Sequence, residues 1–273
     1  MMMGLSYRIC FNLSYMNNYN KQYGIVILLD ALGTRQRIIK DLDSYITDWE
    51  LVINKLQTNI QKLNQGLSLR NYKSGIRMKD IFDNIQIFYP IDNPFTTYVD
   101  LSGDNSLWWS LQHSADLLIN FFQYALTKKI FFRGCISIGH VIEVRKTFYS
   151  TALIENADLT ESFNLIGIIC GPTALRVLNN KQYYSSPIFP NFVKYKIPYK
   201  NKKSINHYPE LPIVNIIKKS NMFDNLDDIT IGIDYTINEQ INNNNEKNIL
   251  QKWKNTKKFF EFIQQIKDEK FYL

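Results

Sequence analysis

Two acidic residues, Asp30 and Asp83, lie in surroundings that favour metal and phosphate chemistry. Asp30 follows the apolar run 25–29, which is short, unbroken and rich in β-branched residues and therefore predicts a buried strand. Gly33 comes three residues later and allows a tight turn that exposes backbone N–H groups. A carboxylate beside free amides suits a divalent cation that carries phosphates. The alternative is an ordinary strand-end aspartate that serves a turn or a helix cap.

Asp83 lies in the predicted turn of a hairpin over residues 76–89, which Pro90 ends. Between the first strand and this hairpin, apolar residues recur at three- and four-residue steps and predict a helix over 44–65. In a β-α-β-β order the hairpin lies beside the first strand, so its turn falls near Asp30. Two carboxylates would then converge on one or two Mg²⁺ or Mn²⁺ ions. The corresponding chemistry is two-metal phosphoryl transfer.

The elements that must position these acids follow from the rest of the pattern. The sequence predicts helices over 106–127, 151–162, 171–178 and about 246–268, strands over 130–141 and 166–169, and a partner strand that ends at residue 149. The order strand, helix, hairpin, helix, strand predicts an α+β fold, a ferredoxin-like (split β-α-β) antiparallel sheet with helices on one face. We expect an N-terminal leader at 1–22, the main domain at 23–198 and a C-terminal extension at 199–273. The terminal helix would either pack on the domain or act as a separate module.

Composition narrows the class of protein. The 273 residues carry a formal charge of +7, but the excess is dispersed lysine without an Arg-rich block, so no specific nucleic-acid partner is indicated. The three cysteines are widely spaced, and neither a secretory signal nor a run long enough to span a bilayer is visible. We therefore expect a cytoplasmic protein that does not act at a membrane.

Four segments, taken together and in order, resemble class III nucleotide cyclases. The sequence Leu-Asp-Ala-Leu-Gly-Thr at 29–34 is similar to the metal loop Asp-x-x-Gly-Phe/Thr of that family, and Lys-Asp-Ile-Phe-Asp-Asn at 79–84 is similar to its Lys-x-x-Gly-Asp hairpin. Residues 132–139 resemble its Arg-x-Gly-Ile-x-x-Gly strand and turn, and 148–155 resemble the segment that enters its last catalytic helix. The nearest branch is a divergent bacterial one that includes the pyrimidine nucleotide cyclases of antiphage signalling.

The resemblance implies a role for each matched residue. It implies two Mg²⁺ or Mn²⁺ ions, with Asp30, Asp83 and the carbonyl of Ala31 as metal ligands. It also implies that the backbone amides of Leu32, Gly33 and Thr34 bind the phosphates. It also implies a homodimer with shared active sites.

Three further residues follow from the same resemblance, two of them with an alternative left open. Lys79 would contact the edge of the base, or would be an exposed hairpin lysine. Arg133 would contact phosphate or ribose across a dimer interface, or would form an ion pair at the sheet edge. Asn156 would orient the ribose.

The sequence also departs from the family pattern. Phe82 replaces the glycine usual before the second metal aspartate, and no arginine follows at the expected spacing on the helix after Ile154. Arg35, Arg37 or Arg145 would then have to stabilise the charge that develops on the α-phosphate.

The resulting hypothesis is a nucleotide cyclase that converts a nucleoside triphosphate, first choice UTP or CTP, to a 3′,5′-cyclic nucleotide and pyrophosphate as a signal in antiphage defence. One alternative is a degenerate cyclase-like module that binds a nucleotide or a protein without turnover. A nucleotidyltransferase on a palm-like fold is a third, against which the lack of a Gly-Gly-Asp-Asp/Glu hairpin argues.

Overall fold

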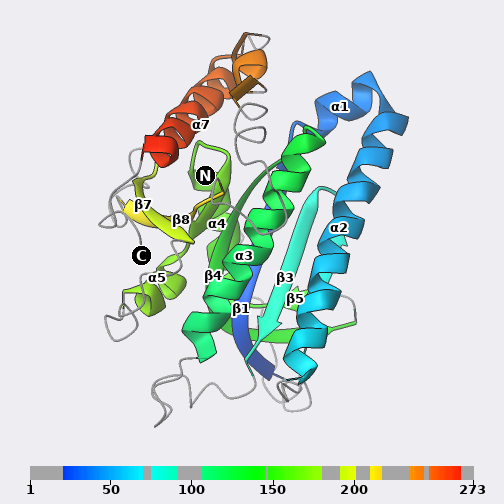
Figure 1. The fold of residues 1–273 in the computed structure, drawn as a ribbon, viewed down its shortest axis with the longest axis vertical. Coiled ribbons are helices and arrows are strands. Elements are labelled where there is room, and N and C mark those ends of the chain that lie inside the picture. The colour runs from blue at the N-terminus through cyan, green and yellow to red at the C-terminus, as the bar shows by residue number, and fades with distance from the viewer. Residues whose placement is uncertain are drawn as a thin grey trace, which may run out of the picture.

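The computed structural model describes residues 21–69, 75–91, 106–145, 147–179, 191–200, 210–216, 234–235, 237–242 and 246–265. Its strands are β1 (Lys21–Leu32), β2 (Arg77–Ile81), β3 (Asn84–Pro90), β4 (Phe131–Val144), β5 (Thr147–Tyr149), β6 (Gly167–Cys170), β7 (Phe192–Lys196) and β8 (Glu210–Val214). Its helices are α1 (Thr34–Lys40), α2 (Leu42–Leu69), α3 (Ser106–Thr127), α4 (Thr151–Ser162), α5 (Pro172–Leu178) and α7 (Lys247–Gln265). Figure 1 shows these elements around one sheet.

The strands form one eight-stranded sheet in the order β2-β3-β1-β4-β6-β8-β7, with β5 paired to β4. All described pairings are antiparallel except that of β4 with β6. Helix α2 connects β1 to β2, and α3 connects β3 to β4, so that each connection passes over an intervening strand. The predicted α+β class is confirmed, and the sheet that the structure shows is large and mostly antiparallel.

Strand β1 lies at the centre of the sheet and is covered on both faces. Ile25 and Ile27 pack into the main core together with apolar residues of α2 and α3. Val26 faces the other way and packs with Ala152 of α4 in a second cluster. The expectation of helices on one face only is therefore wrong. A strand without apolar–polar alternation needs cover on both sides, and that is what the unbroken run in β1 has.

The chain beyond residue 198 contributes to the same sheet. Strand β8 lies between β6 and β7, so the boundary expected at 198–199 runs through the sheet. Helix α7 packs against the sheet through its buried residues Trp253, Thr256, Phe259, Phe260 and Ile263. The packing is specific, because the backbone N–H of Ile166 donates to Thr256 Oγ1 at 2.9 Å and Asn255 Nδ2 donates to the carbonyl of Asn164 at 2.8 Å.

Element boundaries differ from the predicted ones mainly near the N-terminus. Strand β1 begins at Lys21, four residues before the apolar run, and α1 was not predicted at all. The rest of the expected leader, 1–20, and most of the expected loop, 92–105, lie outside the described residues. In the part of the chain that is described, no helix has both the length and the apolar character needed to cross a membrane.

Candidate active site

The end of β1 turns into α1 through a short loop that contains Gly33. The φ angle of Gly33 is 75°, and a Cβ added there would meet nothing within 4 Å. Glycine is therefore favoured at this position by its backbone conformation and not by crowding. Just before it, the carbonyl of Ala31 accepts a hydrogen bond of 3.3 Å from Thr34 Oγ1. This is one interaction for an oxygen with two lone pairs, so the carbonyl can still accept another ligand.

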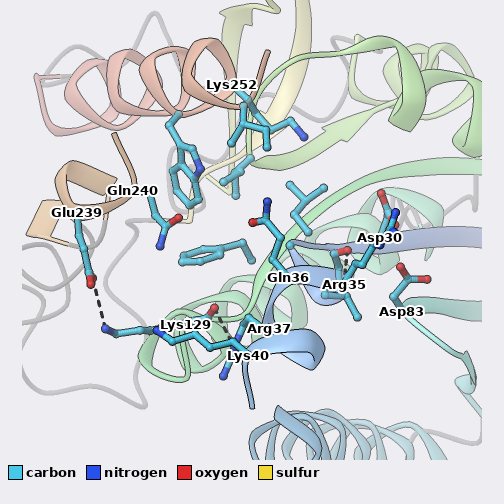
Figure 2. Close-up of a pocket in the computed structure, with 18 of the residues that line it drawn as sticks. Asp30, Arg35, Gln36, Arg37, Lys40, Asp83, Lys129, Glu239, Gln240 and Lys252 are labelled. Carbon is cyan, nitrogen blue, oxygen red and sulfur yellow. Dashed lines mark hydrogen bonds and ion pairs between the residues drawn. The ribbon is translucent and has the colours of Figure 1, made fainter. Parts of the chain in front are cut away.

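Asp30 and Asp83 are brought together by the pairing of β1 with β3. Asp30 is in register with Asn84, and the backbone N–H of Ala31 donates to the carbonyl of Asp83 at 2.8 Å. Asn84 Nδ2 in turn donates to Asp83 Oδ1 at 2.9 Å. Figure 2 shows the two carboxylates next to each other at one side of a cavity. The prediction that the hairpin turn lies beside the end of the first strand is confirmed.

The cavity has a volume of about 820 Å³, within the range of small-molecule sites. Its wall is formed by the end of β1 with α1, by the β2–β3 turn, and by the C-terminal part of the chain on the opposite side. The acidic residues that line it are Asp30, Asp41, Asp83 and Glu239, the basic ones are Arg35, Arg37, Lys40, Lys129 and Lys252, and the large apolar ones include Phe131, Ile166, Ile249 and Trp253. The cavity thus combines an acid pair, several cations and an apolar wall.

Arg133 lies beside Asp30 on the neighbouring strand β4. Its Nε donates to Asp30 Oδ2 at 2.7 Å, and the two side chains are 13% and 20% exposed. Its Nη1 is buried and has no hydrogen-bond partner among the described residues. Arg133 therefore forms an ion pair, one of the two roles that the sequence left open, although the pair lies between two central strands and not at the sheet edge.

This cavity is not lined by three of the site residues expected from the sequence, namely Arg133, Lys79 and Asn156. Lys79 forms an ion pair with Glu143, and its Nζ lies 5.1 Å from the centre of the Phe148 ring. Burial disfavours the charged form of Glu143, but Lys79 and Arg77 outweigh burial and lower its pKa. Asn156 is fully buried, and its Nδ2 donates to the carbonyl of Val26 at 2.9 Å, which fastens α4 to β1.

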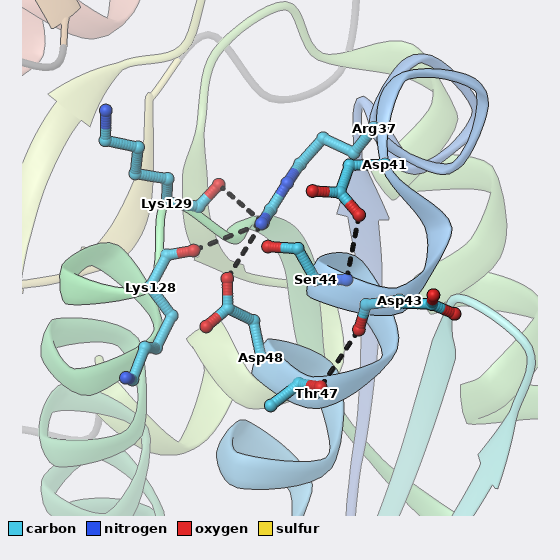
Figure 3. Close-up of polar contacts among 8 residues, drawn as sticks. All are labelled: Arg37, Asp41, Asp43, Ser44, Thr47, Asp48, Lys128 and Lys129. Atoms are coloured by element: carbon cyan, nitrogen blue, oxygen red, sulfur yellow. Dashed lines mark hydrogen bonds and ion pairs between the residues drawn. The ribbon is translucent and has the colours of Figure 1, made fainter.

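The candidate arginines for the developing phosphate charge differ in availability. Arg37 Nη2 pairs with Asp48 Oδ2 at 2.9 Å, and its Nη1 donates to the carbonyl of Lys128 at 3.1 Å, so it ties α1 to α2 and to the end of α3 (Figure 3). Arg145 lies in the β4–β5 turn and does not line the cavity. Arg35 lines the cavity and is exposed.

Lys252 of α7 is a cavity residue that sequence reasoning missed. Its pKa is lowered to about 8, chiefly by burial and then by Arg133 and Lys200, while Asp30 acts in the opposite direction. The only sequence signal was the amphipathic pattern of the terminal helix, which predicts a packed face but not which lysine the packing turns toward a site. Its position depends on how α7 docks.

Asp30, Asp83 and the Ala31 carbonyl can hold a metal ion only if a bound ligand supplies further oxygen atoms to it. Among the described residues no three His, Cys, Asp or Glu side chains gather into a metal-binding group. Mg²⁺ commonly uses one or two carboxylates and completes its shell with water and substrate phosphates. Asp30, Asp83 and the Ala31 carbonyl match such a donor set, and Arg133 already occupies one oxygen of Asp30.

No protein-family model and no curated protein matches this chain, so the function proposed next rests on the residues of the cavity, on their geometry and on the resemblance of the four segments.

Proposed function

We propose that the protein is a metal-dependent nucleotide cyclase, which converts a nucleoside triphosphate to a 3′,5′-cyclic nucleotide and pyrophosphate. The observation that carries the proposal is that Asp30 and Asp83, from two separate segments, lie at one side of a cavity of about 820 Å³ that cations and an apolar wall complete. The order β2-β3-β1-β4, with α2 and α3 as connections, supports the ferredoxin-like core of class III cyclases.

Each part of the cavity would have a separate task. Asp30 and Asp83 would hold Mg²⁺ or Mn²⁺, which when bound activates the attacking hydroxyl and offsets charge on the leaving pyrophosphate. The backbone amides of Leu32, Gly33 and Thr34 would hold phosphate oxygens. In the reaction the ribose 3′-oxygen bonds to the α-phosphorus, its proton leaves to solvent, and the bond from the α-phosphorus to the bridging oxygen of pyrophosphate breaks.

The apolar wall gives the nucleoside a place to bind. Phe131 and Trp253 line the cavity. The centroids of their rings lie 4.8 Å apart, and the interplanar angle is 88°. A flat base packs well on such aromatic surfaces. The preference for UTP or CTP rests on the sequence resemblance alone, because Lys79 is engaged with Glu143 away from the cavity. Homodimerisation and a role in antiphage signalling rest on the same resemblance.

A second candidate function is binding of a nucleotide without turnover. Two observations favour it: Arg133 occupies an oxygen of Asp30, and Asn156 is directed into the core and cannot orient a ribose in the cavity as it stands. In addition, α4 carries no arginine that could stabilise charge on the α-phosphate. This second function involves the same nucleotide ligand as the cyclase function, but no reaction of that nucleotide.

One assay separates the two functions. The purified full-length chain is incubated with Mn²⁺ and separately with ATP, GTP, CTP and UTP, and pyrophosphate and cyclic product are measured, the product by mass. Asp30→Asn and Asp83→Asn keep the side-chain shape but remove the charge. Asp158→Asn, an exposed change on α4 outside the cavity, is the matched control.

The cyclase proposal predicts cyclic product that the two active-site variants abolish and the control retains. Nucleotide binding without product from any of the four triphosphates overturns the cyclase and supports the binding module. Product that survives both active-site substitutions overturns the assignment of Asp30 and Asp83 as metal ligands.

A further inference from the structure

We propose that the docked helix α7 completes the cavity with a polyphosphate-binding subsite, in which Lys252 binds the phosphate chain of the ligand and the neighbouring cations Lys200 and Arg133 add positive charge beside it. The inference deepens the proposed function and rests on it for the identity of that ligand. It assigns a binding role to the C-terminal extension, for which sequence reasoning left open only packing or a separate module.

The first argument is the local balance of charge. Lys252 lines the cavity, whereas Lys200 and Arg133 do not. These two cations, from other parts of the chain, nevertheless lie near enough to lower the pKa of Lys252, while Asp30 raises it. Asp30 is paired with Arg133, and Glu161 is the other carboxylate that acts on Lys200. The buried Nη1 of Arg133 keeps a donor for which the described residues offer no acceptor. A polyanion bound at Lys252 would supply the negative charge that this cluster of cations lacks.

The charged forms of Lys252 and Lys200 are both disfavoured in the folded protein. Burial first, and the neighbouring cations Arg133 and Lys200 second, together lower the pKa of Lys252 to about 8 against the opposing effect of Asp30. The pKa of Lys200 is lowered for the same kinds of reason, burial first and Arg133 second. A bound anion stabilises cations that lie close together and are partly buried more strongly than it stabilises isolated surface lysines.

The second argument is that the cluster is held in position by specific contacts. In the turn of α7 that follows Lys252, Trp253 packs against Phe131 and Thr256 accepts the hydrogen bond from the N–H of Ile166. The backbone N–H of Lys200 donates to the carbonyl of Ser162 at 2.9 Å, which holds this segment on the end of α4. Figure 2 shows Lys252 at the cavity wall formed by α7, across from α1. The fold thus places the cations before any ligand binds.

The third argument concerns the arginine that α4 lacks. Arg37 is engaged in the contact with Asp48 and two carbonyls, and Arg145 lies outside the cavity. Lys252 lines the cavity, is partly buried and has its charge directed into a cluster that already includes Asp30. Arg35 also lines the cavity but is exposed, so among these groups Lys252 is the one best placed to bind a phosphate of a ligand whose metal lies at Asp30.

The test measures binding and does not need turnover. Isothermal titration of the full chain with sodium tripolyphosphate, in EDTA at pH 7, reports the subsite without metal. Lys252→Gln should weaken binding by about tenfold or more, the loss expected for one charge-assisted hydrogen bond. Lys252→Arg keeps the charge and should stay within about threefold of wild type. Lys254→Gln, an exposed lysine on the same helix, removes the same charge and should leave affinity unchanged.

The outcomes separate this inference from the cyclase proposal. Unchanged affinity of a folded Lys252→Gln variant, with folding checked by its melting temperature, overturns the subsite, as does an equal loss in Lys254→Gln. If wild type binds tripolyphosphate through Lys252 but makes no cyclic nucleotide, the subsite stands and the cyclase fails. If wild type makes cyclic nucleotide while Lys252→Gln matches it in both assays, the cyclase stands and the subsite fails.

Discussion

Arg133 Nε donates a hydrogen bond of 2.7 Å to Asp30 Oδ2, which joins the two central strands β1 and β4 through the acid proposed to bind metal. The pair is in register across the sheet and partly buried, so the guanidinium supplies a direct charge-assisted hydrogen bond to a carboxylate at the edge of the cavity. A divalent ion must therefore compete with Arg133 for Asp30. A bound phosphate chain would ease this competition, because it offers Arg133 a second anionic partner.

The first prediction concerns this competition. Arg133→Gln should bind Mn²⁺ several-fold more tightly than wild type, since Asp30 loses the cation that competes with the metal for its Oδ2. The same variant should bind tripolyphosphate more weakly. Titration calorimetry with each ligand measures both effects, and Arg145→Gln, outside the cavity, is the control. Weaker Mn²⁺ binding in Arg133→Gln would contradict the competition.

The second prediction concerns the turn before Asp83. Phe82 is 94% exposed and has a φ of 56°, a left-handed conformation that a bulky residue adopts only at a cost. This explains why glycine is the residue usual here in the family that the hairpin resembles. Phe82→Gly should be more stable than Phe82→Ala by about 1 kcal/mol, because both remove the ring but only glycine relieves the backbone. Urea denaturation of the two variants compares them, and equal stabilities would refute the strain.

The third prediction is a pH dependence of stability. Lys252 has a pKa of about 8 in the folded protein against 10.5 for an ordinary lysine, owing to burial and to Arg133 and Lys200, with Asp30 opposing. Between these two pKa values the unfolded chain binds more protons than the folded protein, so the contribution of Lys252 to the free energy of unfolding rises with pH. Below about pH 8 Lys252 is charged in both states, and the full cost of burying its charge destabilises the folded protein.

Lys252→Gln should therefore be more stable than wild type at pH 7, and the difference should shrink toward zero as the pH approaches 10.5. Denaturation curves of both proteins at pH 7, 9 and 10.5 give the difference, with Lys254→Gln as the control that should show no such trend. A difference that is constant with pH would mean that the charge of Lys252 is not destabilised in the folded protein.

The fourth prediction tests whether docking of α7 positions the subsite. Thr256 is 1% exposed and accepts the hydrogen bond from the N–H of Ile166 at 2.9 Å. Thr256→Val keeps the shape but leaves that N–H buried and unpaired, which should cost about 1–3 kcal/mol of stability. Tripolyphosphate binding should weaken as well. Thr256→Ser retains the hydroxyl and should keep most of the affinity for tripolyphosphate. If Thr256→Ser loses as much affinity as Thr256→Val, the lost hydrogen bond is not the cause.

Local patterns identified the elements around the acid pair well. The helix at 106–127 and the helix at 151–162 have the predicted bounds, and for the first of them the apolar periodicity is a strong local signal. The placement of the Asp83 turn beside the end of β1 also followed from the sequence, since the β-α-β-β order leaves little choice in where the hairpin pairs.

Other features depended on contacts between distant segments. The sequence of 199–273 suggested an extension, yet β8 is inserted between β6 and β7 and α7 forms a wall of the cavity. Asn156 and Lys79 matched positions in motifs, but side-chain direction is decided by packing: Asn156 bonds to β1 and Lys79 bonds to Glu143. A motif gives the order of residues along the chain and carries no information on which partner each side chain finds.

The sequence by itself determined the α+β class, the core strand β1 and the convergence of Asp30 and Asp83, because these depend on short-range patterning and on the connection rules of a sheet. Only the tertiary structure decided that Arg133 pairs with Asp30, that α4 covers the second face of the sheet and that Lys252 lines the same cavity. These contacts join segments about a hundred residues or more apart in the chain. Their geometry results from packing of the whole domain, which no local pattern encodes.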